Sequence, residues 1–182
     1  METFNEDVLR QSLSRLDPWK RIAFMALLCE RMLPNYERFN ADSGFGDTRV
    51  LRRGIDLVWS WLEVDQVPDD IEAIYTQVER QAPNTIGFSS LFTSAALDAA
   101  NAVAITLDAI RMTNGSDAVE VASLARDTVD LYLQEVENLD PNDPGLEEAI
   151  RRNPLMQAEL RRQREDLVDL ERCRRSSACI RG

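Results

Sequence analysis

Six charged residues lie close together in the sequence, and their side chains could either bind an anion or hold two helices together. They are Glu30, Arg31, Asp47, Arg52, Arg53 and Asp56. Charged groups are costly to bury unless they are paired, so one interpretation is an ion-pair network that fixes the angle between two helices. In the other interpretation the arginines grip a small anionic ligand through paired hydrogen bonds. The sequence leaves both interpretations open.

Three members of this set are carboxylates that could hold a divalent metal ion, namely Glu30, Asp47 and Asp56. Two further acidic pairs are spaced like half of the magnesium-binding motifs of helical pyrophosphohydrolases: Asp127 with Asp130, and Asp166 with Asp169. The glutamates that complete such motifs are missing, and acidic pairs at this spacing are usually part of a solvated helix face. We therefore expect no metal ion and no other cofactor.

The sequence contains no histidine. This excludes Ser-His-Asp and Cys-His catalysis, HExxH zinc sites and histidine-containing di-iron bundles. The cysteines are Cys29, Cys173 and Cys179, without a CxxC pair, and Cys29 lies in an apolar run where a thiol packs as a small hydrophobic group. Catalysis would have to use carboxylates, cysteine, tyrosine or Lys20, the only lysine. An enzyme is therefore the least favoured of three function classes.

The formal net charge is −11, which repels the phosphates of nucleic acids, so we expect no DNA binding. The C-terminal part is a local exception, because it contains Arg151, Arg152, Arg161, Arg162, Arg164, Arg172, Arg174 and Arg175. Segment 117–138 is acidic, so one interpretation is charge complementarity between two helices, within one molecule or across a dimer. A patch for RNA or an acidic partner is the alternative, although it lacks the interleaved aromatic residues of single-strand binding surfaces.

The chain begins METFNEDV, without the basic and apolar regions of a secretory signal. No apolar run approaches the roughly 20 residues that a membrane-spanning helix needs. We therefore expect a cytoplasmic protein with reduced thiols and no contact with a membrane.

Helical periodicity recurs along the chain and strand alternation is nearly absent, which predicts an all-α fold. The main expected helices span about 4–16, 18–33, 48–65, 69–81, 90–113, 117–138, 146–152 and 154–175. The run from Ile22 to Cys29 leaves almost no polar face, and such a helix should be buried on all sides. The sequence predicts a single domain, residues 1–175, of about six to eight helices around a central helix 18–33, followed by a frayed tail, 176–182.

Individual residues predict where several of these helices begin and end. Pro18 should open the central helix, and Pro34 should break it and leave a short helix at 35–41, because proline lacks an amide donor. The other expected boundaries are a loop at Gly44–Gly46, caps at Asp47 and at Ser89 or Ser90, a junction at Asn114–Ser116 and a loop at 140–145. Asp98, Asn101 and Asp108 are expected to form a solvated stripe.

The first third of the chain contains many uncommon residue types at fixed spacing: Trp19, Phe24-Met25-Ala26, Cys29-Glu30-Arg31-Met32, Pro34-Asn35-Tyr36, Phe39, Gly44-Phe45-Gly46-Asp47, Arg52-Arg53 and Asp56-Leu57-Val58-Trp59. In these residues the chain resembles the YjaG-like proteins, a bacterial family classed as a domain of unknown function. Weaker similarity continues through Leu97-Asp98-Ala99, Ala118–Val121 and Asn153-Pro154, whereas residues 63–92 differ most. The resemblance implies a compact, cytosolic, all-helical fold. It implies no reaction and no catalytic residues.

These observations favour a non-enzymatic protein-interaction or structural module, expected to be a homodimer and to bind a protein partner that the sequence does not identify. The alternative is a binder of a small anionic ligand at the cluster of Glu30, Arg31, Asp47, Arg52, Arg53 and Asp56.

Overall fold

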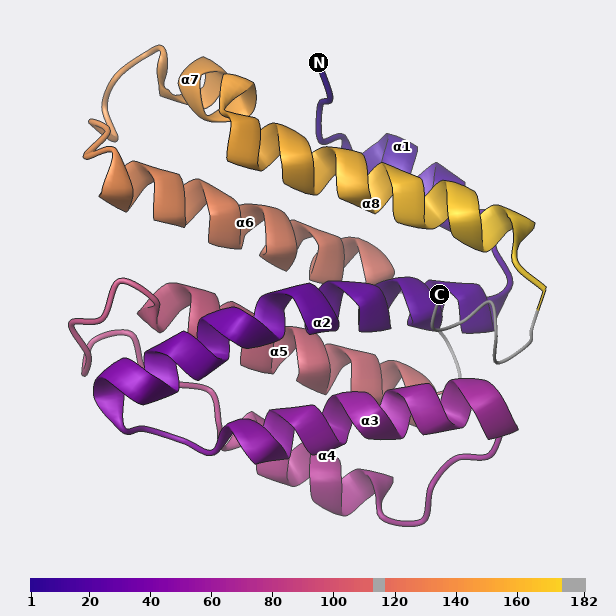
Figure 1. Ribbon diagram of the computed structural model, residues 1–182. Helices are drawn as coiled ribbons and strands as arrows, with labels where there is room; N and C mark the ends of the chain where they lie inside the picture. The colour runs from indigo at the N-terminus through magenta and orange to yellow at the C-terminus, as the bar shows by residue number, and fades with distance from the viewer. Residues whose placement is uncertain (113–116, 175–182) are drawn as a thin grey trace.

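Eight α-helices account for the regular structure of residues 1–112 and 117–174, the part of the chain described by the computed structural model (Figure 1). The helices are α1 (Glu6–Ser14), α2 (Pro18–Ser43), α3 (Thr48–Val64), α4 (Ile71–Glu79), α5 (Thr93–Arg111), α6 (Ala118–Val136), α7 (Leu146–Arg152) and α8 (Pro154–Arg172). None of the described residues is in a strand, and the all-α prediction is confirmed.

Helix α2 lies in the middle of the bundle, with α6 and α8 on one side and α3 and α5 on the other (Figure 1). The side chains of Phe24, Met25, Ala26 and Leu28 are completely buried, and only Leu27 in this run is partly accessible. The predicted central helix is confirmed, because helices packed on opposite sides remove nearly all of its apolar surface from water.

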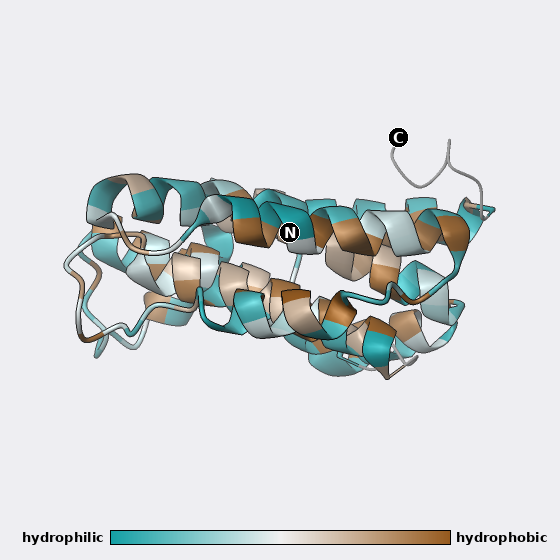
Figure 2. Ribbon diagram, turned by 90° about the horizontal axis from the view of Figure 1, so that it is seen from below, coloured by the Kyte–Doolittle hydropathy of each residue, from teal (hydrophilic) through white to brown (hydrophobic). Residues whose placement is uncertain are grey.

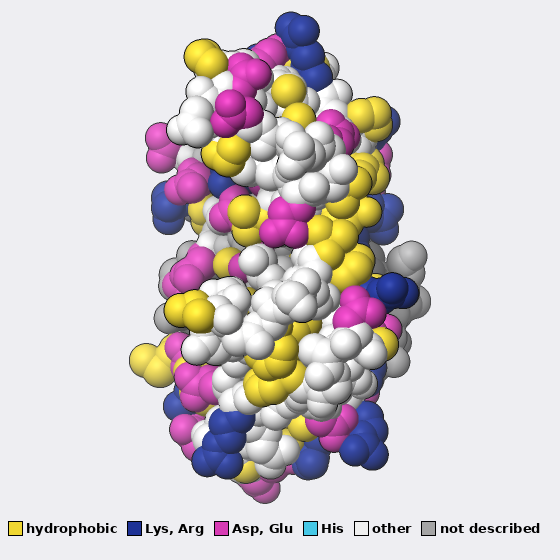
Figure 3. All heavy atoms as spheres, turned by 90° about the vertical axis from the view of Figure 1, so that its left-hand side faces the viewer, with side chains coloured by type: hydrophobic (Ala, Val, Ile, Leu, Met, Phe, Trp, Pro, Cys, Tyr) yellow, Lys and Arg dark blue, Asp and Glu magenta, His cyan; other side chains and the backbone are white. Residues whose placement is uncertain are grey.

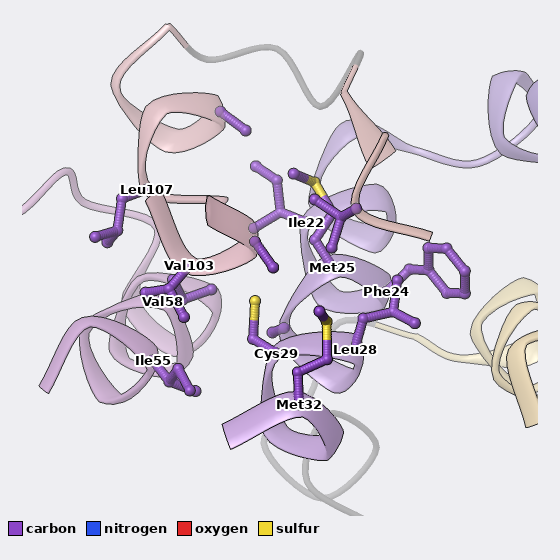
Figure 4. Close-up of a cluster of buried hydrophobic side chains, with 14 of the residues drawn as sticks. Ile22, Phe24, Met25, Leu28, Cys29, Met32, Ile55, Val58, Val103 and Leu107 are labelled. Atoms are coloured by element: carbon purple, nitrogen blue, oxygen red, sulfur yellow. The ribbon is translucent and has the colours of Figure 1, made fainter. Parts of the chain in front are cut away.

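Buried side chains of α2, α3 and α5 share one hydrophobic core. In Figure 4, Cys29 and Met32 of α2 lie near Ile55 of α3 and Val103 of α5. Gly54 of α3 allows a close approach, because a Cβ atom there would lie 2.9 Å from Cγ1 of Val103. Helix α5 faces the core largely with alanines, and small side chains let neighbouring helices come close.

The break expected at Pro34 was wrong, because α2 continues through it to Ser43. A proline inside a helix costs about 3 kcal/mol through a lost hydrogen bond and a steric clash. On both sides of Pro34 the helix is fixed by buried side chains, among them Leu33, Tyr36 and Phe39. Each large buried apolar side chain contributes about 1.5–3 kcal/mol, so packing outweighs the local preference.

Other boundaries were predicted with mixed success. The loop at 44–46 is confirmed, with Gly44 and Gly46 at positive φ, and the Asp47 side chain caps α3 by accepting a hydrogen bond from the amide of Arg49. The expected serine cap was wrong, because α5 begins at Thr93 after Phe92. Instead, the Ser90 hydroxyl accepts a hydrogen bond from the amide of Phe92 in the preceding turn. The expected junction at 114–116 and the tail 176–182 lie outside the described residues.

Most helices are amphipathic, and hydrophobic and hydrophilic stretches alternate along the ribbons in Figure 2. On α1 the side chains of Leu9 and Leu13 are buried, as is Leu16 just after the helix, whereas Val8 is 60% exposed. No helix in the described part of the chain combines the length and the apolar character needed to cross a membrane.

Candidate functional site

The structure distributes the six charged residues expected at one site among four separate contacts. Glu30, Arg52 and Asp56 stay together. Arg31 points to α8, Arg53 pairs with Asp70 at 2.7 Å, and Asp47 pairs with Arg49 at 2.7 Å. Hydrogen bonds from Arg49 lower the pKa of Asp47. The three carboxylates considered for a metal therefore do not converge, and no three metal-ligating side chains meet among the described residues.

Glu30 and Arg52 form a two-pronged ion pair that joins α2 to α3. Nη1 and Nη2 of Arg52 donate to the two carboxylate oxygens of Glu30 at 2.7 and 2.8 Å, while Nε donates to Asp56 at 3.0 Å. The indole Nε1 of Trp59 donates to Glu30 at 2.7 Å. The hydrogen bond with Glu30 raises the pKa of Arg52. Each nitrogen of this guanidinium therefore has an acceptor within the protein, which is the arrangement of an ion-pair network between helices.

Arg31 lies on another face of α2 and binds two carboxylates of α8. Nη1 donates to Oδ2 of Asp166 at 2.6 Å, and Nη2 reaches Oε1 of Glu159 at 3.5 Å. The Asp166 side chain is only 4% exposed, and Arg162 also approaches it, at 3.3 Å. Burial raises the pKa of Asp166, which Arg31 and Arg162 partly oppose. The solvated face expected for Asp166 was therefore wrong.

The inner face of α8 contains a buried polar pair that was not predicted from the sequence. The side chains buried on this face follow a helical spacing: Met156, Leu160, Gln163, Asp166 and Leu170. Two of these residues, Gln163 and Asp166, are polar. Gln163 donates hydrogen bonds to the carbonyl of Ala122 and to Glu159. The apolar spacing around these polar residues was the sequence signal that could have revealed them.

Next to Arg31 lies a hollow of about 530 Å³ between α2, α6, α8 and the start of α5, which we call the α6–α8 groove. Its lining residues are Arg31, Asn35, Leu91, Phe92, Ser94, Ala95, Thr128, Val129, Leu131, Tyr132, Glu135, Leu155, Ala158, Glu159 and Arg162. Its walls are mostly apolar, and four of the lining residues are charged: Arg31, Glu135, Glu159 and Arg162. This combination of apolar walls and a few polar groups is typical of binding sites.

Apolar side chains at the groove remain exposed to solvent. Leu91, Leu131 and Leu155 are 39, 43 and 52% accessible, respectively. The ring centroids of Phe92 and Tyr132, two residues that line the groove, lie 6.2 Å apart. The space-filling view onto the end of the bundle where α5 and α8 begin shows hydrophobic side chains gathered beside acidic and basic ones (Figure 3).

One carboxylate beside the groove, that of Asp98, has a raised pKa. Thr128, which lines the groove, donates a hydrogen bond of 3.0 Å from its hydroxyl to Oδ2 of Asp98 on α5. Burial raises the pKa of Asp98 to about 6, the Thr128 bond opposes the rise, and the nearby charge of Asp127 adds to it. Asp98 is therefore half-buried between α5 and α6, and the fully solvated stripe expected for Asp98, Asn101 and Asp108 was wrong at this position.

The C-terminal arginines make their intramolecular ion pairs outside α6. Within the described residues Arg162 approaches Glu165 and Asp166 of its own helix, and Arg164 binds Glu2 at 2.8 Å. Arg151 and Arg152 both pair with Glu148 of α7. Among the described ion pairs of these arginines none reaches α6, so charge complementarity between the two helices, within one molecule or across a dimer, stays a prediction.

Cys29 is completely buried, and its sulfur lies 3.4 Å from the hydroxyl of Thr106. Burial raises the pKa of this thiol to about 12. A nucleophilic cysteine needs a lowered pKa and access to substrate. Cys29 has neither property, which confirms its expected packing role.

Three comparisons with known proteins agree with one another. A family model described as "Protein of unknown function (DUF416)" matches residues 8–181. The uncharacterized protein YjaG of Escherichia coli is 32% identical over 149 residues, which cover 81% of this chain and 74% of that protein. An uncharacterized protein of Haemophilus influenzae is 30% identical over 142 residues, covering 77% and 72%. The crystal structure of a DUF416 family protein from Shewanella baltica superimposes with a TM-score of 0.87 at 26% identity, covering 95% of this chain and 89% of that one.

Proposed function

The chain belongs to the DUF416 family of proteins of unknown function, and we propose that it is a non-enzymatic, cytoplasmic protein-interaction module whose contact surface is the α6–α8 groove. Family membership brings no reaction with it, so the proposal depends on the surface of this chain.

The observation that carries the proposal is the grouping of exposed leucines around an apolar hollow. Single exposed apolar residues are normal on a protein surface, whereas contiguous ones mark interaction sites. Leu131 of α6 and Leu155 of α8 line the same hollow with Leu91 from the loop before α5. The groove also contains Phe92, Tyr132 and arginines, and aromatic and arginine side chains are enriched where proteins bind one another.

The alternative, a small anionic ligand at the cluster of residues 30–56, receives less support. The three nitrogen atoms of the Arg52 guanidinium already donate to Glu30 and Asp56, so an anion at Arg52 would compete with two carboxylates. Arg53 is engaged by Asp70 at an exposed position. Arg31 already binds Asp166, whose buried charge would lose its partner.

Site-specific photocrosslinking in the native cytosol tests the proposed surface. A photoreactive residue replaces Ala158 inside the groove, and in the control it replaces Val64, which is 59% exposed at the end of α3. We expect a discrete crosslinked protein from position 158 and none from position 64. The crosslinked protein, once purified, should bind the wild-type chain and should bind Leu131→Asp at least about tenfold more weakly. Equal crosslinking at both positions, or none at 158, would contradict the proposal.

A further inference from the structure

We propose that the occupant of the α6–α8 groove is a second copy of this chain, related by a two-fold axis, with Arg162 of each copy against Glu135 of the other. This inference rests on the proposed function and names the partner for the same surface. The steps below use the charges at the groove rim, the direction of the two helices and the position of the exposed leucine between them.

The groove rim carries both signs of charge. Glu135 is exposed near the end of α6, and its carboxylate has no ion-pair partner among the described residues. Arg162 is 58% exposed on α8. Its Nε is 3.3 Å from Asp166, and its other ion pair among the described residues, with Glu165, is long at 3.9 Å. Both side chains therefore have unused hydrogen-bonding capacity at the edge of the hollow.

The two charges lie at different positions along the groove. Helices α6 and α8 are adjacent and antiparallel, and Asn153, just before α8, donates a hydrogen bond to Glu137, just after α6 (Figure 1). Glu135 is therefore level with the first turn of α8, near Leu155. Arg162 is seven residues further along, which corresponds to about 10 Å of helix. The acidic and the basic group thus mark opposite ends of one short surface.

A two-fold axis exchanges the two ends of such a surface. When the groove faces a copy of itself across an axis perpendicular to α6 and α8, Arg162 of one molecule meets Glu135 of the other, and the pair occurs twice. An isologous interface requires this self-complementarity, because the same patch serves both subunits. A groove that bound a strongly basic or strongly acidic partner would instead carry charges of one sign, opposite to those of the partner.

Leu131 lies on α6 one helical turn before Glu135, between the two charged ends, and is 43% exposed. The axis therefore places it close to Leu131 of the second copy, where two leucines can bury each other's apolar surface. The chain carries a net charge of −11, so two copies repel each other at long range. The short-range Arg162–Glu135 pairs and the leucine contact have to overcome this repulsion, which makes the dimer sensitive to single charge reversals.

Sedimentation velocity of the full chain over a wide concentration range tests this arrangement. We expect the wild type to approach twice the mass of one chain. Arg162→Glu and Glu135→Arg should each weaken the dimer at least about tenfold, because each places two like charges together twice. The double variant restores both pairs in swapped form and should recover the dimer. Arg10→Glu, on the exposed α1, is the matched control and should leave the mass unchanged.

Each other outcome overturns the inference. A wild type that stays monomeric excludes the second copy as the occupant, and a dimer insensitive to both reversals must use another surface. If the two single variants dissociate and the double variant does not recover, the two-fold pairing is wrong. If the chain is monomeric but position 158 still crosslinks to a different protein, the proposed function holds and the second copy is excluded as the occupant.

Discussion

Nη1 of Arg31 on the central helix donates a 2.6 Å hydrogen bond to Oδ2 of Asp166, a carboxylate of α8 that is almost completely buried. The pair fastens α8 to α2 directly beside the α6–α8 groove. Burial raises the pKa of Asp166, and the charges of Arg31 and Arg162 oppose the rise. The position of α8, and with it one wall of the groove, therefore depends on Arg31.

Replacing Arg31 by methionine should destabilise the protein by about 3 kcal/mol, because removal of one partner leaves a buried charge uncompensated. Urea unfolding followed by circular dichroism measures this loss. The double variant Arg31→Met with Asp166→Leu should be more stable than Arg31→Met alone, because neither charge remains. Arg53→Met removes the exposed pair with Asp70 and should cost less than about 1 kcal/mol. Equal losses from Arg31→Met and Arg53→Met would contradict the account.

The Glu30–Arg52 pair should behave as a structural link between α2 and α3. A double-mutant cycle with Glu30→Ala and Arg52→Ala should give a coupling energy of about 0.5–3 kcal/mol, as expected for residues that share two hydrogen bonds. Phosphate and sulfate should shift the unfolding midpoints of the wild type and of Arg52→Ala equally at constant ionic strength, because these anions stabilise folded proteins in general and all three nitrogens of Arg52 already donate to carboxylates. A coupling near zero, together with a phosphate shift that Arg52→Ala abolishes, would favour an anion site instead.

Asp98 should make the stability of the protein depend on pH in a defined direction. Its pKa is about 6 in the folded state, above the value of about 3.9 expected in the unfolded chain. Between these values the folded state binds more protons, so stability increases as the pH falls from about 6 to about 4. Above pH 6 the folded state instead carries the cost of a half-buried charge.

The variant Asp98→Asn removes this charge and keeps an oxygen that can accept the hydrogen bond from Thr128. It should be more stable than the wild type at pH 7.5, and the difference should shrink as the pH falls through 6 and disappear near 4. Asp169→Asn, an exposed carboxylate on α8, serves as the control. Urea midpoints across this pH range provide the measurement. A pH-independent difference for Asp98→Asn would show that its charge does not titrate in this window.

The all-α fold and the central helix could be predicted because they depend on composition and periodicity. The run from Ile22 to Cys29 has no polar face, and only burial on all sides satisfies such a helix. The continuation through Pro34 could not be predicted, because a local rule about proline says nothing of the packing that Leu33 and Tyr36 find in the folded protein. Tertiary contacts override such local preferences.

The candidate site was harder to predict, because closeness in sequence was taken as closeness in space. Glu30 and Arg31 are neighbours in the chain, but on a helix consecutive side chains point about 100° apart. Glu30 therefore meets Arg52 of α3, whereas Arg31 meets Asp166 of α8. The α6–α8 groove is assembled from four segments, and no single stretch of the sequence contains its pattern.

Crosslinking at residue 131 tests the central claim, that a second copy covers the α6–α8 groove, most directly. Leu131→Cys is introduced into a chain in which Cys173 and Cys179 are replaced by serine, while Cys29 stays buried and unreactive. Val64→Cys in the same background is the control. With a short bis-maleimide, the account predicts covalent dimers from Leu131→Cys and none from Val64→Cys. Monomers from both variants, or equal crosslinking of both, would contradict it.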